Sequence, residues 1–343
     1  MKVLVTGHNG YIGAVMVPML QASGHEVFGL DTKYFEDCVF TGQKVIIPEI
    51  KVDIRDVKQG DVKGFDAIIH LAALSNDPLG DINPKLTHDI NFESSVRLAE
   101  LAKKSGVKKF IFSSTCSVYG TSEGRIVNEK TDPNPLTAYA ESKVLAEKNI
   151  SKLASSSFSP TFLRSATAYG VSPKLRSDLV VNNLVGWAYA TGKILLKSDG
   201  KSWRPLVHIA DISRAFISVL HAENRIVYDQ TFNVGKTEEN YQILQVAELV
   251  NEGVPNSKVE FAEGAEPDKR SYRVDFSKIK SHLPSFQPDW TVKKGVVELY
   301  NAYAEYNMTT EELEGPRFRR LNHLQQLMEE GRLDPFLAWK NGD

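Results

Sequence analysis

Residues 2–13, Lys-Val-Leu-Val-Thr-Gly-His-Asn-Gly-Tyr-Ile-Gly, contain the strand, turn and helix start that decide the fold of this chain. Residues 2–6 are apolar and largely β-branched, which predicts a buried strand. Residues 11–23 predict a helix that ends at Gly24. A strand that passes through a glycine-rich turn directly into a helix is typical of the first β-α-β unit of a nucleotide-binding fold.

The glycines of this turn have separate uses. Gly7 permits a tight turn, Gly10 lets backbone amides approach a pyrophosphate, and Gly13 lets the helix pack closely on the strand. The spacing is Gly-x-x-Gly-x-x-Gly rather than Gly-x-Gly-x-x-Gly, but the strand before it and the helix after it fit. With Tyr11 and Ile12, these glycines predict a loop that binds a dinucleotide.

Asp31 ends the next predicted strand, residues 26–31, and lies 18 positions beyond Gly13. A carboxylate there would bind the two hydroxyls of an adenosine ribose and repel a 2′-phosphate, which favours NAD over NADP. Lys33 nearby slightly opposes this preference.

Strand and helix patterns alternate through the first half of the chain. Further strands are predicted at 67–72, 109–114 and 161–165, and helices at 87–104 and 137–153. This alternation predicts an α/β fold, a Rossmann-type doubly wound parallel sheet with helices on both faces.

After Gly170 the rhythm changes, with a helix at 178–191 and a strand at 193–197. We therefore predict a dinucleotide-binding domain at 1–170, to which 205–235 returns, and a smaller C-terminal α/β substrate-binding lobe. That lobe would comprise 171–204 and 236–343, with a C-terminal helical extension. Its charged tail, from Thr309, predicts a solvated surface helix or a subunit contact.

The composition is that of an ordinary globular protein: 343 residues, 42% hydrophobic and 24% charged, with a formal net charge of −2. We therefore expect no nucleic-acid partner, and no apolar run is long enough to suggest a membrane span. Cys38 and Cys116 are the only cysteines. A disulfide framework and a cysteine-based zinc site are thus not expected, and we predict a reduced cytoplasmic protein without a metal.

Tyr139 and Lys143 lie four residues apart on the helix predicted at 137–153, so they share a face. A phenol beside a fixed ammonium can act as a general acid and base, because the cation favours the phenolate. The same spacing recurs at Tyr189 and Lys193, where Gly192 breaks the helix, so the second pair is interpreted as a coincidence.

These motifs together resemble the extended short-chain dehydrogenase/reductase family, in its NAD-dependent nucleotide-sugar epimerase/dehydratase branch, of which UDP-glucose 4-epimerase is typical. The resemblance is an ordered series across roughly residues 1–290. It comprises the glycine loop, Asp53-Ile54, His70-Leu-Ala-Ala73, Asn91, Ser113-Ser-Thr-Cys-Ser-Val-Tyr-Gly120, Tyr139-x-x-x-Lys143 and Arg204-Pro-Leu-Val-His208 with Asp211.

The resemblance implies roles for the residues around the cofactor, NAD. Asp53 and Ile54 would contact the adenine, the run Leu71, Ala72 and Ala73 would contact the pyrophosphate and nicotinamide ribose, and Asn91 would help to anchor the cofactor. His70 is more simply interpreted as a satisfied histidine at the end of a strand.

The resemblance also implies a catalytic group. Thr115 would hydrogen-bond the substrate oxygen, Tyr139 would exchange the hydroxyl proton, and Lys143 would stabilise the phenolate and bond the nicotinamide ribose. In the 4,6-dehydratases of this branch an Asp-Glu pair follows the catalytic Thr. Here Cys116 and Ser117 stand there, which disfavours dehydration, and Cys116 is interpreted as a small buried hydrophobe.

The implied substrate is a nucleotide-diphosphate sugar. Arg204 and Arg270 are candidates for its diphosphate, because guanidinium groups suit phosphate oxygens, and Arg273 is interpreted as a surface charge. Thr167 takes the place where sugar epimerases commonly carry a phosphate-contacting Asn, which is a departure from a standard UDP-hexose enzyme.

Three functions follow from these residues. The first is a C4 epimerase that works through a transient 4-keto sugar with retained NAD. The second is an NAD(P)-dependent ketoreductase or dehydrogenase that performs half of that cycle. The third is an idle NAD-binding scaffold, which the intact Tyr, Lys and glycine loop disfavour. A homodimer is expected from the resemblance, and the helix that bears Tyr139 is a candidate for its contact.

Overall fold

The computed structural model describes residues 1–40, 46–75, 83–266, 268 and 270–340. At the centre of this part of the chain is a seven-stranded parallel sheet with the order β11-β7-β5-β4-β1-β2-β3. Its strands are β1 Lys2–Thr6, β2 Glu26–Asp31, β3 Glu49–Lys51, β4 Ala67–His70, β5 Lys109–Thr115, β7 Ser159–Ser165 and β11 Gln230–Val234. The strand order reverses between β1 and β4, where a doubly wound sheet binds its ligands. The predicted fold class is confirmed.

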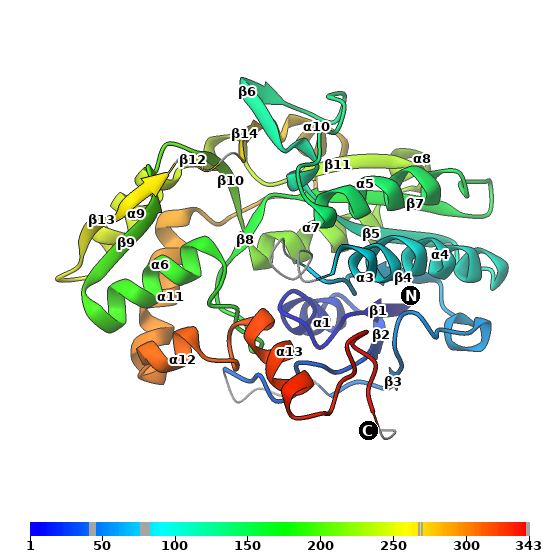
Figure 1. Cartoon of the computed structure of the whole chain (residues 1–343). Helices are drawn as coiled ribbons and strands as arrows, with labels where there is room; N and C mark the ends of the chain where they lie inside the picture. Colours follow the sequence, from blue (N-terminus) through cyan, green and yellow to red (C-terminus); the bar gives the residue numbers. More distant parts are fainter. Residues whose placement is uncertain (41–45, 76–82, 267, 269, 341–343) are drawn as a thin grey trace.

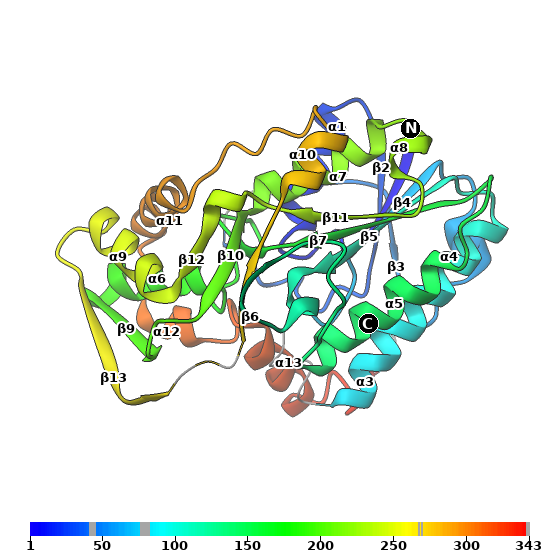
Figure 2. The same cartoon turned by 90° about the horizontal axis from the view of Figure 1, so that it is seen from above.

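Helices cover both faces of this sheet, as Figure 2 shows. One face carries α1 (Gly13–Ala22), α7 (Ile209–His221) and α10 (Ser277–His282), and the other carries α4 (Ser94–Lys104) and α5 (Ala138–Ser151). Successive side chains of a strand point to opposite faces. In β1, Val3 and Val5 accordingly lie in the core between the sheet and α1, α7 and α10, here called the first core. Leu4 lies in the second core, between the sheet and α4 and α5.

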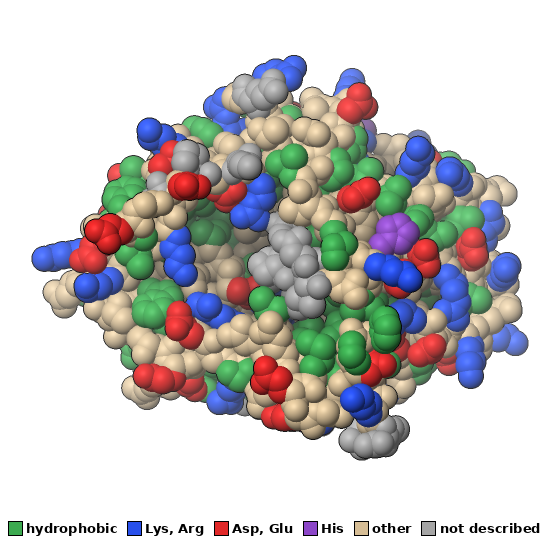
Figure 3. Space-filling view, in the orientation of Figure 1, with side chains coloured by type: hydrophobic (Ala, Val, Ile, Leu, Met, Phe, Trp, Pro, Cys, Tyr) green, Lys and Arg blue, Asp and Glu red, His purple; other side chains and the backbone are tan. Residues whose placement is uncertain are grey.

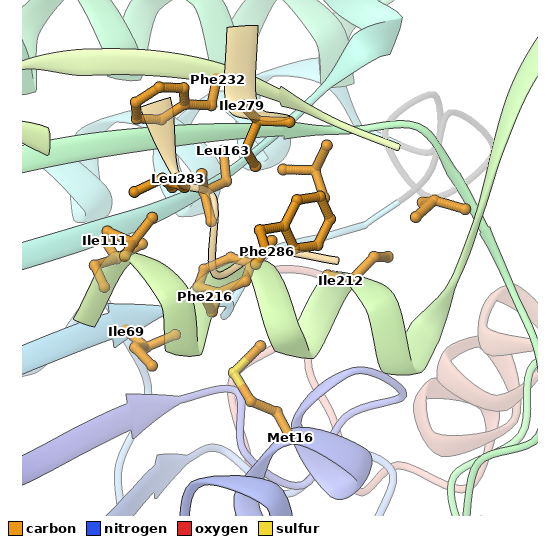
Figure 4. Close-up of a cluster of buried hydrophobic side chains, with 14 of the residues drawn as sticks. Met16, Ile69, Ile111, Leu163, Ile212, Phe216, Phe232, Ile279, Leu283 and Phe286 are labelled. Atoms are coloured by element: carbon orange, nitrogen blue, oxygen red, sulfur yellow. The ribbon is translucent and has the colours of Figure 1, made fainter. Parts of the chain in front are cut away.

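The first core shows why a distant segment returns to the sheet (Figure 4). Phe216 of α7 packs with Ile111 and Leu163 of the strands, and Phe286 covers the cluster from beyond α10. These side chains are buried, and each apolar side chain buried in this way contributes roughly 1.5–3 kcal/mol. The burial brings residues 209–221 and 230–234 onto the larger half of the molecule.

The smaller lobe has a core of its own, formed by α6 (Val180–Thr191), α9 (Ile243–Gly253) and α11 (Val292–Tyr306) (Figure 1). Two short sheets, with the strand orders β12-β10-β8 and β13-β9, contribute to this core, and a third, β14-β6, packs on the core that also contains α1 and α7. Their strands are β6 Thr121–Val127, β8 Thr167–Tyr169, β9 Lys193–Ser198, β10 Trp203–His208, β12 Asn240–Gln242, β13 Lys258–Glu266 and β14 Ser271–Val274.

The predicted helices are present, but their bounds differ from the observed ones: 11–23 is Gly13–Ala22 and 137–153 is Ala138–Ser151. The helix predicted at 87–104 consists of α3 (Pro84–His88), a π-helical turn (Asp89–Glu93) and α4. The helix predicted at 178–191 begins at Val180, after a turn in which the Asp178 side chain is paired with Arg176. Short helices complete the fold at α8 (Asn224–Val227), α12 (Thr310–Glu314) and α13 (Arg320–Glu329).

The charged tail contains helices, as predicted, and Gln325 and Glu329 of α13 are exposed, but the other face of α13 is buried. Helix α13 buries Leu324 and Leu327 in the core that also contains α4 and α5, and Leu333 and Leu337 follow them there. Because these four leucines stand among many charged residues, the sequence of the tail did not indicate a buried face. Figure 1 shows the segment after α13 beside β2 and β3, and its Trp339 donates to the Thr32 carbonyl, so this segment lies on the larger half, although we predicted all of 236–343 in the smaller lobe.

Candidate active site

A cavity of about 580 Å³ lies at the carboxyl ends of the central strands, with residues of both halves in its wall. Figure 3 shows the surface hollowed near the middle of this face. The structure brings nearly all the predicted site residues into this wall, namely Gly7, Gly10, Tyr11, Ile12, Gly13, Asp31, Asp53, Ile54, Leu71, Ala72, Ala73, Thr115, Tyr139, Lys143, Thr167, Arg204 and Arg270.

The glycine loop fits against its surroundings only because it lacks side chains. Gly7 has φ +72°, and a Cβ there would lie 2.7 Å from the backbone nitrogen of Ala72. A Cβ on Gly13 would lie 2.4 Å from the carbonyl oxygen of His8. The first turn of α1 can therefore approach the end of β1 and present its amides to the cavity, as a dinucleotide-binding loop does.

Asp31 ends β2 with both carboxylate oxygens toward backbone amides. Oδ2 accepts from the Asn9 amide at 3.0 Å and Oδ1 from the Lys33 amide at 2.7 Å. The Lys33 ammonium is 2.5 Å from the Glu49 carboxylate, which neutralises its charge. The sequence predicted that Lys33 slightly opposes the preference for NAD, and this ion pair weakens that opposition.

Asn91 is the predicted cofactor residue that the structure does not bring to the cavity wall. Its side chain is fully buried in the π-helical turn. Oδ1 accepts from the Leu74 amide at 2.8 Å, and Nδ2 donates to the Leu74 carbonyl at 3.0 Å. Asn91 therefore holds the loop after β4 in place, and it acts on the cavity through that loop.

His70 is a satisfied strand-end histidine, as interpreted. Its Nδ1 lies 2.6 Å from Thr6 Oγ1, and its Nε2 lies 2.8 Å from Ser95 Oγ. Burial lowers the pKa of His70 to about 3, so the ring is neutral and fixes β1, β4 and α4 to one another.

Tyr139 and Lys143 lie on the first turns of α5, which the side chain of Thr137 caps by accepting from the Ala140 amide at 3.2 Å. The Lys143 Nζ donates to the Ser113 carbonyl at 2.8 Å and lies 6.0 Å from the centre of the Tyr139 ring. Thr115, at the end of β5, accepts from the Ser117 amide at 3.1 Å. These side chains form one wall of the cavity.

Burial lowers the pKa of Lys143 to about 7, although the nearby Glu147 carboxylate acts to raise it. The lowered pKa lets Lys143 lose its proton near neutral pH. Perturbed pKa values of this kind are frequent among groups that take part in proton transfer. The other pair with this spacing is indeed a coincidence, because Gly192 ends α6 at φ +71°, Lys193 begins β9, and neither side chain lines the cavity.

A buried ionic network supports this wall from behind, and sequence reasoning missed it. Arg164 and Glu147 approach to 2.6 Å, and Ser114 Oγ donates to Glu147 at 2.5 Å. Cys116 is fully buried, with its thiol 3.1 Å from the Arg164 carbonyl, and burial raises its pKa well above the ordinary value. The interpretation of Cys116 as a buried hydrophobe is therefore confirmed.

Two arginines share one carboxylate where β10 and the segment before β14 form the cavity wall. Arg204 and Arg270 lie 2.7 Å and 3.0 Å from the same oxygen of Asp268. Two cations with one anion leave a net positive charge, which suits a diphosphate. Arg273 stacks over the Trp203 ring at 5.0 Å and does not line the cavity.

Besides Asp268, sequence reasoning missed three charged side chains of the cavity wall, Arg176, Asp178 and Arg320. Arg176 and Asp178 form an ion pair at 2.6 Å, and Arg176 also donates to Ser75 Oγ at 3.0 Å. They stand in segments without a recognisable motif, and only the folded chain brings them to the glycine loop.

The fold and this cavity define a dinucleotide-binding α/β protein with a tyrosine-lysine pair beside the cofactor site. Residues 3–235 match the model of the NAD dependent epimerase/dehydratase family, which covers well over half of the chain. The chain belongs to that family, and NAD is its cofactor.

Named relatives within this family carry out more than one reaction. The chain is 29% identical to a UDP-glucose 4-epimerase of Mycolicibacterium smegmatis, over 87% of this chain and 97% of the relative. It is 26% identical to UDP-glucuronic acid decarboxylase 4 of Arabidopsis thaliana, over 86% and 67%. The solved structure of MoeE5 in complex with UDP-glucuronic acid and NAD has the same fold, with a TM-score of 0.78, 24% identity and coverage of 89% and 99%.

The described helices do not include one with the length and apolar character that a bilayer crossing requires. The family assignment and the residues of the cavity wall together indicate a nucleotide sugar as the class of substrate to consider.

Proposed function

We propose that this protein is an NAD-dependent nucleotide-sugar epimerase that inverts C4 through a transient 4-keto sugar. One observation carries the proposal: Thr115, Tyr139 and Lys143 form one wall of a cavity that also contains the glycine loop and the Arg204–Arg270 pair. A proton-transfer group, a cofactor loop and a diphosphate-binding pair therefore face a single space.

In this mechanism Tyr139 removes the proton of the sugar hydroxyl and later returns it, while Thr115 hydrogen-bonds the same oxygen. In its protonated form Lys143 favours the phenolate of Tyr139, because a nearby cation stabilises the charged form. The glycine loop and Asp31 would hold NAD, which would supply a reversible hydride acceptor for the reacting carbon. Arg204 and Arg270 hold the diphosphate while the keto sugar turns to present its other face.

The residues after Thr115 support a reaction confined to one hydride and one proton. Cys116 is fully buried and cannot reach a substrate, and Ser117 is not a carboxylic acid. The carboxylate pair that would eliminate water is therefore absent from these positions. A 4-keto sugar would also precede decarboxylation, so UDP-glucuronic acid belongs among the substrates to be tried.

The test is incubation of the purified protein and NAD with UDP-glucose, followed by nuclear magnetic resonance of the sugar and absorbance of NADH. We expect UDP-galactose to form with no net NADH. Stoichiometric NADH would favour the dehydrogenase, release of carbon dioxide from UDP-glucuronic acid would favour a decarboxylase, and either outcome would overturn the C4 epimerase.

A further inference from the structure

Arg320 is a buried arginine whose charge has no carboxylate partner among the described residues. Its side chain is 3% exposed and lines the cavity. Nη2 donates to the Lys174 carbonyl at 2.8 Å, whereas Nη1 is buried with no hydrogen-bond partner in the described part of the chain. A buried cationic donor without a partner costs free energy, and a bound anion would remove that cost.

The charged groups nearest to Arg320 do not meet this need. Asp178 is already paired with Arg176, and Arg176 adds a second positive charge. The pKa of Arg320 is lowered to about 10, chiefly by burial and also by the cation of Arg176, and neither the Cys38 thiol nor the Asp178 carboxylate offsets this shift. A thiol whose own pKa burial raises remains neutral, so it does not supply the missing anion.

Arg320 lies on the cofactor side of the cavity. Its guanidinium stacks over Phe35, which follows Asp31 and β2, at 4.2 Å. Its partner Lys174 is joined to the glycine loop through Ser172, whose hydroxyl donates to the Tyr11 carbonyl at 2.8 Å and accepts from the Lys174 amide at 3.1 Å. Arg204 and Arg270, the candidates for the substrate diphosphate, come from β10 and the segment before β14 in the other half.

The segment after α13 is fixed to the same wall. Trp339 Nε1 donates to the Thr32 carbonyl at 2.7 Å, and the Tyr34 hydroxyl donates to the Leu337 carbonyl. Arg55, which is paired with Asp53, donates to the Phe336 carbonyl at 2.7 Å. The tail thus packs behind the residues that would hold the adenosine.

We propose that Arg320 binds a phosphate oxygen of the dinucleotide's pyrophosphate, so that residues 320–339 form part of the NAD site and slow release of the cofactor. The pyrophosphate is the anionic part of NAD, and a guanidinium binds phosphate oxygens through charge-assisted hydrogen bonds. This inference rests on NAD as the cofactor and does not depend on which carbon of the sugar reacts.

The test compares ligands with and without the pyrophosphate. Binding of NAD, ADP-ribose and adenosine is measured by calorimetry on the wild-type protein, Arg320→Met, Arg320→Lys and the control Arg225→Met, whose side chain is exposed on α8. We expect Arg320→Met to weaken NAD and ADP-ribose by about 10- to 100-fold and to leave adenosine unchanged. Arg320→Lys should lose less, and Arg225→Met nothing.

A second measurement needs no substitution. In the wild-type protein, hydrogen exchange of residues 320–339 should slow more with ADP-ribose than with adenosine, because the first ligand supplies the anion. Unchanged NAD affinity in folded Arg320→Met, an equal loss for adenosine, or a tail whose exchange ignores ADP-ribose would overturn the proposal. None of these readouts uses turnover, so a wrong choice of reaction would leave them interpretable.

Discussion

The two ends of the cavity are built from very different lengths of chain. At the end where the sugar would react, Thr115, Tyr139 and Lys143 all come from β5 and α5, within 29 residues of sequence (115–143). At the end where the adenosine would lie, Asp31 and Asp53 are backed by Tyr34 and Arg55, which hold Leu337 and Phe336 from 303 and 281 residues away. Sequence motifs therefore identify the residues of the first end, whereas the residues of the second end come together only when the chain folds.

The same contrast appears in two buried arginines. Arg164, behind the reacting end, has its charge neutralised by Glu147 within the protein. Arg320, at the cofactor end, has no such partner among the described residues. A buried charge that is paired within the protein, such as Arg164, stabilises the fold. One without a protein partner, such as Arg320, is suited to a charged ligand.

The largest effect should come from Tyr139→Phe, which tests whether the reacting end alone carries the chemistry. Loss of the hydroxyl removes the acid and base, so turnover should fall about 10³-fold or more, within the usual range for such groups. NAD binding should change little, because the adenosine end is intact. Turnover within about tenfold of the wild type would show that Tyr139 has another role.

A second substitution, Glu147→Ala, breaks the support behind the reacting end. It leaves the Arg164 cation buried and unpaired, which typically costs about 3–5 kcal/mol of unfolding free energy. Chemical denaturation measures this loss. Lys294→Ala, which removes an exposed ion pair, is the control and should cost less than about 1 kcal/mol. Equal losses in the two variants would contradict the structural role of the network.

The pH dependence of stability tests the burial of Lys143. Because its pKa is lowered to about 7 from 10.5, the folded protein releases this proton at a lower pH than the unfolded chain does. The unfolded chain therefore binds more protons between these values, and stability rises with pH there by up to about 1.4 kcal/mol per unit from this group. In ligand-free Lys143→Met that contribution should be missing from the slope, and an unaltered slope would mean that Lys143 titrates normally.

The smallest effect should come from Trp339→Phe at the adenosine end. The ring is largely kept, but the hydrogen bond to the Thr32 carbonyl is lost, which typically costs about 1 kcal/mol. We expect a decrease of that size in unfolding free energy and release of NAD faster by less than about tenfold. Stopped-flow displacement of NAD measures the release rate. A release rate equal to that of the wild type would show that this contact of the tail does not slow release of NAD.

The sequence by itself determined the α/β class, the parallel order of strands and helices, the glycine loop and the Tyr139–Lys143 pair. These features depend on short-range rules: β-branched runs form strands, glycines relieve tight contacts, and residues four apart share a helix face. It also identified Asp31, since the end of a strand in this fold lies at the ligand edge.

Only the tertiary structure decided the position of Asn91 behind the Leu74 loop, the pairing of Lys33 with Glu49, and the burial of the tail. Each of these depends on contacts between residues distant in sequence. Spacing cannot encode which charged side chain meets which partner, because burial and pairing are set by the packed neighbours. Arg320 therefore looks like any surface arginine in the sequence and becomes a cation of the cavity wall only when the chain folds.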